Sequence, residues 1–129
     1  MKKILLLLSL LIFSLSYSQE WKFLFEINNE SFFFKPNTKN TGWIKVISEK
    51  TEYYLKNIVN VQVTDGYTKT LWKFDCENKK IAPLQINVYS KTGGLLQSIK
   101  KDEYETEMLF VIPDSVGEGF LNAFCNKEN

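Results

Sequence analysis

The sequence contains no histidine and no arginine, and its 129 residues include only 2 cysteines and 3 prolines. Histidine is the commonest general base and metal ligand, and arginine binds carboxylates and phosphates with two parallel hydrogen bonds. Their absence argues against a Ser–His catalytic pair, a histidine-ligated metal and bidentate anion recognition. We therefore expect a noncatalytic protein with no cofactor and no metal site.

Long apolar runs are also absent, except at the N-terminus. Met1–Lys3 is basic, Ile4–Leu15 is apolar apart from two serines, and Ser16–Ser18 offers small residues to a signal peptidase. This pattern predicts a secretory signal peptide over residues 1–18, because the apolar run is too short to span a bilayer. An uncleaved anchor is the alternative. With no cysteine at the cleavage site to carry a lipid, we expect an exported protein in the periplasm, at the cell surface or released, with no membrane span after cleavage.

The charge of the mature chain is nearly balanced. Removing Lys2 and Lys3 from the 16 lysines leaves 14 basic side chains against 15 acidic ones. A near-neutral domain lacks the basic surface that nucleic acid requires, so we expect no nucleic-acid partner. The mature chain, residues 19–129, is about 111 residues long, which suits a single domain.

Two cysteines in an exported protein most simply form one disulfide. Cys76 follows a strand-like run and Cys125 ends a helix-like run. Closing a loop of about 49 residues would stabilise the fold by about 4 kcal/mol in the chain-entropy treatment. An intermolecular disulfide and a reactive thiol are the alternatives.

Alternating apolar and polar residues predict a mostly β chain. The predicted strands cover residues 21–27, 31–35, 42–47, 68–76, 81–90 and 95–99, followed by a last short apolar run at 108–112. Period-two alternation places Trp21, Phe23, Phe25 and Ile27 on one face of the first strand. Pro83 predicts an edge or a bulge early in the fifth strand. Residues 49–67, with a turn at Asp65–Gly66, could extend a strand, add a short one or form a loop.

A helix is predicted at the C-terminus. Ser115 and Glu118 form a capping box, and Asp114 lies where a carboxylate favours a helix N-terminus. The apolar positions then follow at helical spacing: Val116, Phe120, Ala123 and Phe124. So short a helix needs packing to persist, and an antiparallel sheet with one apolar face needs a cover. We therefore predict an α+β fold: a single antiparallel sheet of about six strands, with the C-terminal helix packed on one face and tethered by a disulfide.

Several segments resemble the surface-adhesin protein E family. They are Phe74–Cys76, Lys79–Ile81, Tyr89–Gly93 and Ile112–Glu118 leading to Cys125, with Trp21 and Phe32–Pro36 fitting the opening hairpin. Residues 49–67 depart from the pattern. The resemblance implies a small antiparallel sheet with a helix tethered through Cys76 and Cys125, and a surface protein that binds host matrix and serum proteins. No adhesive motif maps residue by residue onto this chain, so only the disulfide pair is carried over.

Aromatic side chains are the most suggestive binding feature, at 15% of residues. Consecutive phenylalanines on a strand must point to both faces, so at least one ring of Phe32–Phe34 should lie outside the main core. Tyrosine offers contact area at low entropic cost. The candidate interaction surface is Phe32, Phe33, Phe34, Tyr53, Tyr54 and Tyr67. A second packed layer is the alternative explanation.

The leading hypothesis is an exported, noncatalytic, adhesin-like domain that binds a protein partner, or a second copy of itself, through an exposed aromatic surface. The alternative is a periplasmic small-molecule or lipid-binding protein with a cavity between sheet and helix. An enzyme would need clustered groups in a cleft. Asp75 and the acidic run Asp102–Glu107 match no metal-binding loop, and we interpret them as solvated turns. We interpret Ser115 as a helix cap rather than a nucleophile.

Overall fold

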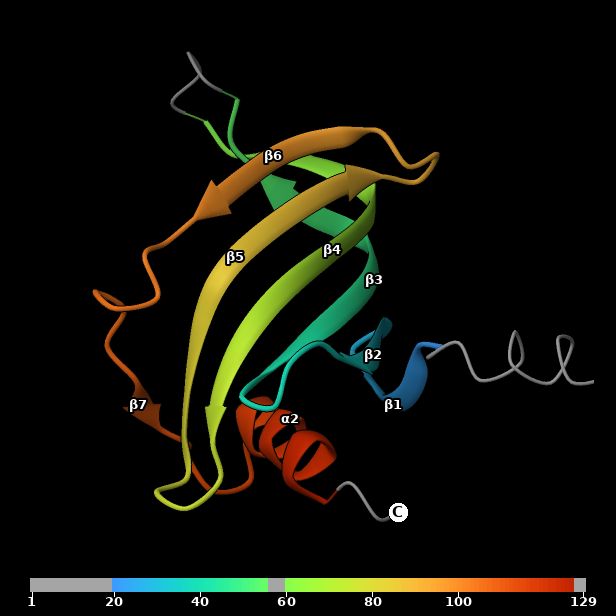
Figure 1. Cartoon of the computed structure of the whole chain (residues 1–129). Coiled ribbons are helices and arrows are strands. Elements are labelled where there is room, and N and C mark those ends of the chain that lie inside the picture. Colours follow the sequence, from blue (N-terminus) through green and yellow to red (C-terminus); the bar gives the residue numbers. More distant parts are fainter. Residues whose placement is uncertain (1–19, 56–59, 127–129) are drawn as a thin grey trace, which may run out of the picture.

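The computed structural model describes residues 20–55 and 60–126, and the predicted signal peptide lies outside these ranges. The described chain forms one seven-stranded antiparallel sheet and one helix (Figure 1). The elements are β1 (Lys22–Ile27), β2 (Glu30–Pro36), β3 (Thr41–Tyr53), β4 (Gln62–Asp75), β5 (Lys80–Ser90), β6 (Leu95–Lys100), β7 (Leu109–Phe110) and α2 (Val116–Cys125). The first six strands pair in chain order, and β7 pairs with β5. The predicted fold class is confirmed, with the short run near residue 110 adding a seventh strand.

The first hairpin follows from its turn residues. Asn28 and Asn29 have positive φ angles of 51° and 66°, and they connect Ile27 directly to its partner Glu30. Asparagine tolerates the left-handed region, and two such residues make a turn whose twist matches that of the flanking strands. One detail of β1 departs from the prediction. The register shifts between Phe23 and Phe25, so these two rings point to opposite faces rather than one.

Within the stretch 49–67, residues 49–53 belong to β3 and residues 62–67 belong to β4, while residues 56–59 lie outside the described ranges. The two strands pair as far as Tyr53 and Gln62, with an irregularity in β3 after Ser48. The predicted turn at Asp65–Gly66 is wrong, because Gly66 lies inside β4 and pairs on both sides. A Cβ at Gly66 would collide with the backbone carbonyl oxygen of Tyr89, so only glycine allows this close approach of β4 and β5.

Pro83 lies at a break in pairing on both sides of β5. Its partner is Trp72, at the point where the β4–β5 register shifts. On the opposite edge, β7 pairs with Lys80 and Ile81, and β6 pairing begins at Gln85. A proline cannot donate a ladder hydrogen bond, so it is tolerated at such a position. The predicted bulge is confirmed.

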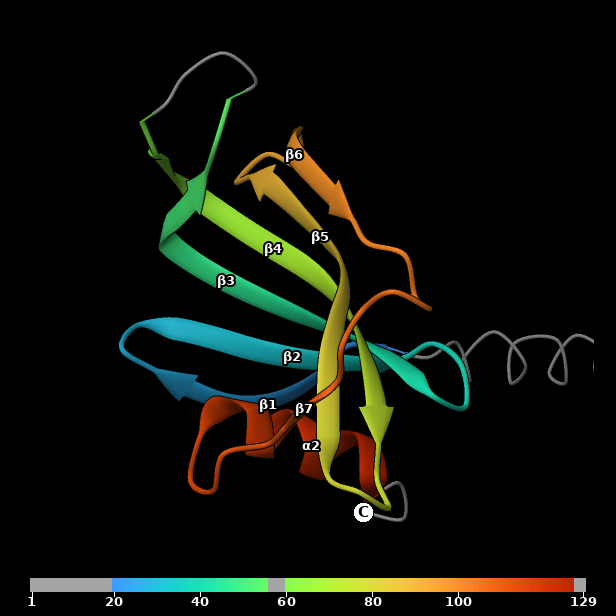
Figure 2. The same cartoon turned by 90° about the vertical axis from the view of Figure 1, so that its left-hand side faces the viewer.

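The core lies between α2 and one face of the sheet. Its buried residues are Phe32, Phe34, Ile44 and Phe74 from the sheet, and Phe120, Leu121 and Phe124 from α2. The ring centroids of Phe74 and Phe124 are 4.4 Å apart, and those of Phe32 and Phe120 are 5.9 Å apart. Figures 1 and 2 show α2 at one end of the sheet, while β6 and the far end of the β3–β4 pair lie at the other. Packed rings therefore lie between the sheet and α2.

The candidate interaction surface needs correction at Phe32 and Phe34. Their exposed fractions are 8% and 5%, because α2 covers the sheet face to which both rings point. Phe33, between them, points to the opposite face, as strand alternation requires. Two of the three consecutive phenylalanines are therefore core residues, and Phe33 alone remains a candidate for binding.

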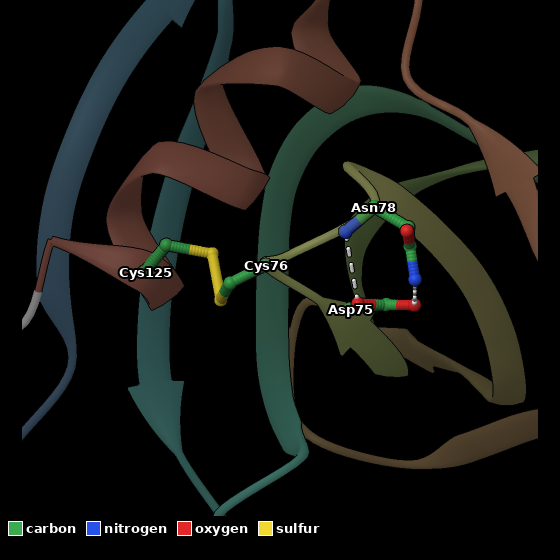
Figure 3. Close-up of a disulfide and its surroundings, with 4 residues drawn as sticks. All are labelled: Asp75, Cys76, Asn78 and Cys125. Atoms are coloured by element: carbon green, nitrogen blue, oxygen red, sulfur yellow. Dashed lines mark hydrogen bonds between the residues drawn. A yellow bond between two sulfur atoms is a disulfide. The ribbon is translucent and has the colours of Figure 1, made fainter.

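The disulfide links the two layers. Cys76 directly follows β4 and Cys125 is the last residue of α2, with Cα atoms 5.8 Å apart (Figure 3). Cys76 and Cys125 therefore pair within the chain, and no free cysteine occurs among the described residues. The bond holds the end of the short helix against the end of a central strand.

Ser115 is the N-cap residue of α2. Its hydroxyl accepts a hydrogen bond from the Glu118 backbone N–H at 3.3 Å and donates one to the Ile112 carbonyl at 2.6 Å. The Ser115 N–H donates to the same Ile112 carbonyl at 3.3 Å, which replaces the reciprocal bond that a full capping box would take from the Glu118 side chain. Asp114 precedes the cap with a positive φ of 64°.

Candidate binding face

The face of the sheet opposite α2, here called the open face, carries a row of side chains in register. Phe33 on β2 pairs with Lys45 on β3, Lys45 pairs with Lys69 on β4, and Lys69 pairs with Asn87 on β5. Residues in register across an antiparallel sheet point to the same side. The adjacent core residues Phe34 and Ile44 point the other way, which places this row away from α2.

Three lysines of the open face converge on one tryptophan. Trp21 lies just before β1, and the Lys45 ammonium is 4.8 Å from the centroid of its ring. The ammonium groups of Lys35 and Lys69 are each 5.9 Å from the same ring. The closest of these cation–π contacts, at 4.8 Å, contributes about 0.5–1 kcal/mol at an exposed site, and the two at 5.9 Å contribute less. Each lysine comes from a different strand, so only the sheet brings them together.

More rings surround these lysines. Tyr67 and Tyr89 lie opposite each other on β4 and β5 and stack with centroids 4.9 Å apart. The Lys69 ammonium is 5.3 Å from the Tyr89 ring centroid, and the Lys45 ammonium is 5.1 Å from that of Phe33. We call this set the lysine–aromatic cluster: Lys35, Lys45, Lys69, Trp21, Phe33, Tyr67 and Tyr89. Phe23, which is 54% exposed, packs edge-on against Phe33 at its margin.

The positive charge of the cluster is not neutralised within the described chain. Neither of the two ion pairs found among the described residues, Lys73–Glu103 and Lys91–Asp65, involves its lysines. Partial burial lowers the pKa of Lys45, and repulsion from Lys69 and then Lys35 lowers it further. Mutual repulsion of this kind indicates a local positive potential without a counter-charge.

Two hollows adjoin the cluster. The first, of about 430 Å³, is lined by residues that include Trp21, Lys35, Asn37, Trp43, Lys69 and Tyr89. The second, of about 410 Å³, is lined by residues that include Lys45, Tyr67, Lys69 and the ion pair Lys91–Asp65. Lys69 lines both hollows, so they form neighbouring parts of one surface. Volumes of this size fall within the range of ligand-binding pockets.

Asn87 also lines the first hollow. Its side-chain oxygen accepts hydrogen bonds from the Ser98 hydroxyl at 2.6 Å and from the Gln85 amide at 3.3 Å. These bonds orient the Asn87 side chain, whose own amide N–H groups have no partner among the described residues. A hydrogen-bond donor is thus held at the hollow beside the rings and ammonium groups.

The predicted surface tyrosines separate into two places. Tyr67 belongs to the lysine–aromatic cluster. Tyr53 is half-buried and Tyr54 is 55% exposed, and both lie where β3 ends, away from the cluster. The Tyr54 backbone N–H donates to the Gln97 side chain at 2.9 Å, which ties this end of β3 to β6.

The predicted binding residues did not include the lysines, Trp21, Trp43 or Tyr89. Strand alternation assigns each of these side chains a face within its own strand, which was the available signal. It does not say which strands are neighbours or how they are offset, so their convergence was not visible.

Asp75 has a structural role in a turn. Asp75 accepts hydrogen bonds from the Asn78 side chain at 2.9 Å and from the Asn78 backbone N–H at 3.1 Å, beside the disulfide (Figure 3). The side-chain bond and then the backbone bond hold the pKa of Asp75 below its ordinary value. These contacts close the turn between β4 and β5. In residues 20–55 and 60–126, no three acidic, cysteine or histidine side chains form a group that could hold a metal ion.

These observations define a class: a small, disulfide-linked α+β domain in which a helix covers one face of the sheet and lysines and aromatic rings occupy the other. The family model of surface-adhesin protein E matches residues 56–126, more than half of the chain, and the chain therefore belongs to that family. No curated protein and no solved structure gives a significant match.

The family match begins after β3. It includes Lys69, Tyr67 and Tyr89 of the cluster, whereas Trp21, Phe33, Lys35 and Lys45 precede it. The described part of the chain has no helix long and apolar enough to cross a membrane.

Proposed function

We propose that this protein is an exported, noncatalytic, adhesin-like domain that binds a partner through the open face of its sheet. The lysine–aromatic cluster is the observation that carries the proposal. Membership of the surface-adhesin protein E family supports a role at the cell surface, and the predicted signal peptide supports export.

The composition of the open face favours an interface over a purely structural role. Aromatic residues are enriched in binding interfaces and supply much of their binding free energy. Phe23 keeps 54% of its surface exposed although a second ring, Phe33, lies beside it. The Lys45–Lys69 pair places two like charges opposite each other, an arrangement that lowers the stability of a sheet. Residues that reduce stability without packing the core are best explained by binding.

Support for a noncatalytic role comes from the ionisable groups. The pKa values of Lys45 and Asp75 are both lowered, and the cause of each shift is structural. Partial burial and then charge repulsion lower the pKa of Lys45, and turn hydrogen bonds lower that of Asp75. Among the described residues, neither Lys45 nor Asp75 lies beside a second ionisable group with which it could act as a general acid–base pair.

The test is to measure binding of the oxidised mature protein, residues 19–129, to a panel of immobilised matrix and serum proteins by biolayer interferometry. Light scattering coupled to size exclusion would detect self-association in the same samples. Phe33→Ser alters the open face without touching the core. Tyr104→Ser is the matched control, because Tyr104 is 94% exposed in the loop between β6 and β7, outside the cluster.

We expect Phe33→Ser to raise the dissociation constant for the partner, or for a dimer, by at least tenfold. Tyr104→Ser should leave both constants unchanged. A dimer that dissociates would identify a second copy as the partner. Equal binding by the wild type and Phe33→Ser, with both folded by near-ultraviolet circular dichroism, would exclude the open face as the binding site.

A further inference from the structure

The open face carries three ammonium groups that form no ion pair with a described carboxylate. The ammonium groups of Lys35, Lys45 and Lys69 all lie within 6 Å of the centre of the Trp21 ring, and none forms an ion pair with a described carboxylate. Bringing an anion among them would replace mutual repulsion by attraction, in a position where partial burial strengthens the interaction. A ligand with acidic groups therefore fits this surface better than a neutral one.

Charge alone does not account for the site, because flat apolar surfaces lie beside the lysines. Trp21, Trp43 and Tyr89 line the same hollow as Lys35 and Lys69. Aromatic faces carry partial negative charge and attract polarised C–H groups. A compact anion such as phosphate would leave these rings unused. The ligand should therefore combine acidic groups with flat, C–H-bearing faces.

Sugar rings have this combination of properties. A pyranose presents C–H groups on a flat face that packs against aromatic rings, and its hydroxyls suit the amides of Asn37 and Asn87 in the first hollow. An acidic peptide would form ion pairs with the lysines, but it would not require several aromatic rings to pack against. Nucleic acid is disfavoured by the absence of arginine and by a net charge of only +1 for the whole sequence.

The shape of the site favours a chain over a single sugar. The two hollows, of about 430 and 410 Å³, share Lys69, and each has at least one further lysine in its lining. Positive charge thus continues from one hollow to the next, as recognition of acidic groups repeated along a polymer would require.

We propose that the lysine–aromatic cluster, together with Trp43 in the first hollow, binds an acidic polysaccharide. Its sugar rings pack on Trp21, Trp43 and Tyr89, and its carboxylate or sulfate groups lie beside Lys35, Lys45 and Lys69. This inference rests on the proposed function, since it names the partner class for the same face. Lysine suits the role, because its ammonium is a mobile point charge that can serve carboxylate and sulfate alike.

The test measures binding of the oxidised mature protein to heparin and to polygalacturonate by isothermal titration calorimetry, with dextran, polyglutamate and single-stranded DNA as comparison polymers. We expect binding to an acidic polysaccharide and none to dextran. Raising the salt concentration from 50 to 200 mM should weaken binding about tenfold or more, because three lysines release counterions.

Variants separate a built site from a general charge effect. Lys45→Gln/Lys69→Gln and Trp43→Ala should each weaken binding at least tenfold, and Lys69→Arg should retain most of it. Lys50→Gln/Lys101→Gln is the charge-matched control, since both lysines are exposed outside the cluster. It should bind as the wild type does. Thermal melting verifies that each variant is folded.

Several results would overturn the inference. Equal affinity for polyglutamate and for the acidic polysaccharides would show that the cluster recognises charge alone. Tighter binding to DNA would show that the ligand is a different polymer. Equal losses in the cluster and control double variants would indicate nonspecific attraction. If no polysaccharide binds while Phe33→Ser still abolishes protein binding or self-association, this inference fails and the proposed function stands. If Phe33→Ser also has no effect, both fail.

Discussion

Lys45 on β3 and Lys69 on β4 lie directly opposite each other in the antiparallel sheet, with no described carboxylate paired to either. Like charges at directly opposed positions cost roughly 0.2–1 kcal/mol. Trp21 partly offsets this cost, because both ammonium groups lie near its ring. Repulsion between Lys45 and Lys69 therefore lowers the stability of the sheet at this position.

Replacing Lys69 by glutamate should stabilise the fold. Lys69→Glu turns a repulsive cross-strand pair into an attractive one, and the cation–π interactions that the substitution removes are long, at 5.3–5.9 Å. We expect the free energy of unfolding, measured by urea denaturation, to rise by about 0.5 kcal/mol. The gain should shrink in 1 M NaCl, because salt screens the interaction. A decrease in stability would mean that the attraction between Lys69 and the rings outweighs the repulsion.

Two neighbouring phenylalanines on β2 should differ sharply. Phe34→Ala removes a buried ring from the core beneath α2 and should lower the free energy of unfolding by about 3–4 kcal/mol. Phe33→Ala removes a half-buried ring on the open face and should cost only about 1 kcal/mol. Urea denaturation of both variants is the measurement, and similar losses would contradict the assignment of the two rings to opposite faces.

Loss of the disulfide should strongly destabilise the protein. Cys125→Ser opens a link between residues separated by 49 positions, and the free energy of unfolding should fall by about 2–4 kcal/mol under oxidising conditions. Thermal and urea denaturation measure the change. Wild-type protein in excess dithiothreitol is the control and should match the variant. An unchanged melting temperature would remove the disulfide from the account of stability.

The helix cap should depend on Ser115 more than on Glu118. Ser115→Ala removes the acceptor for the Glu118 N–H and should cost about 1 kcal/mol. Glu118→Ala should cost less than about 0.5 kcal/mol, because the Ser115 N–H already bonds to the Ile112 carbonyl and only the dipole interaction is lost. Urea denaturation compares the two variants. An equal cost would indicate a full, reciprocal capping box in solution.

Local sequence patterns predicted much of the fold. The strands follow from alternation, the β5 irregularity from Pro83, and α2 from a Ser115 cap with apolar residues at helical spacing. Each depends on residues close together in the chain. Residues 49–53 and 62–67 were harder to predict, because a long paired extension is stabilised by the facing strand rather than by its own sequence.

Residue identity and short-range order were enough to specify the strands, the C-terminal helix, the pairing of the only two cysteines and the lack of histidine and arginine. The assembled sheet was needed to establish that α2 covers Phe32 and Phe34 rather than Phe33. It was also needed to bring Lys35, Lys45 and Lys69 together beside Trp21. Strand register is a nonlocal property, set by the packing of the whole sheet, and a shift of one residue would turn each lysine to the opposite face.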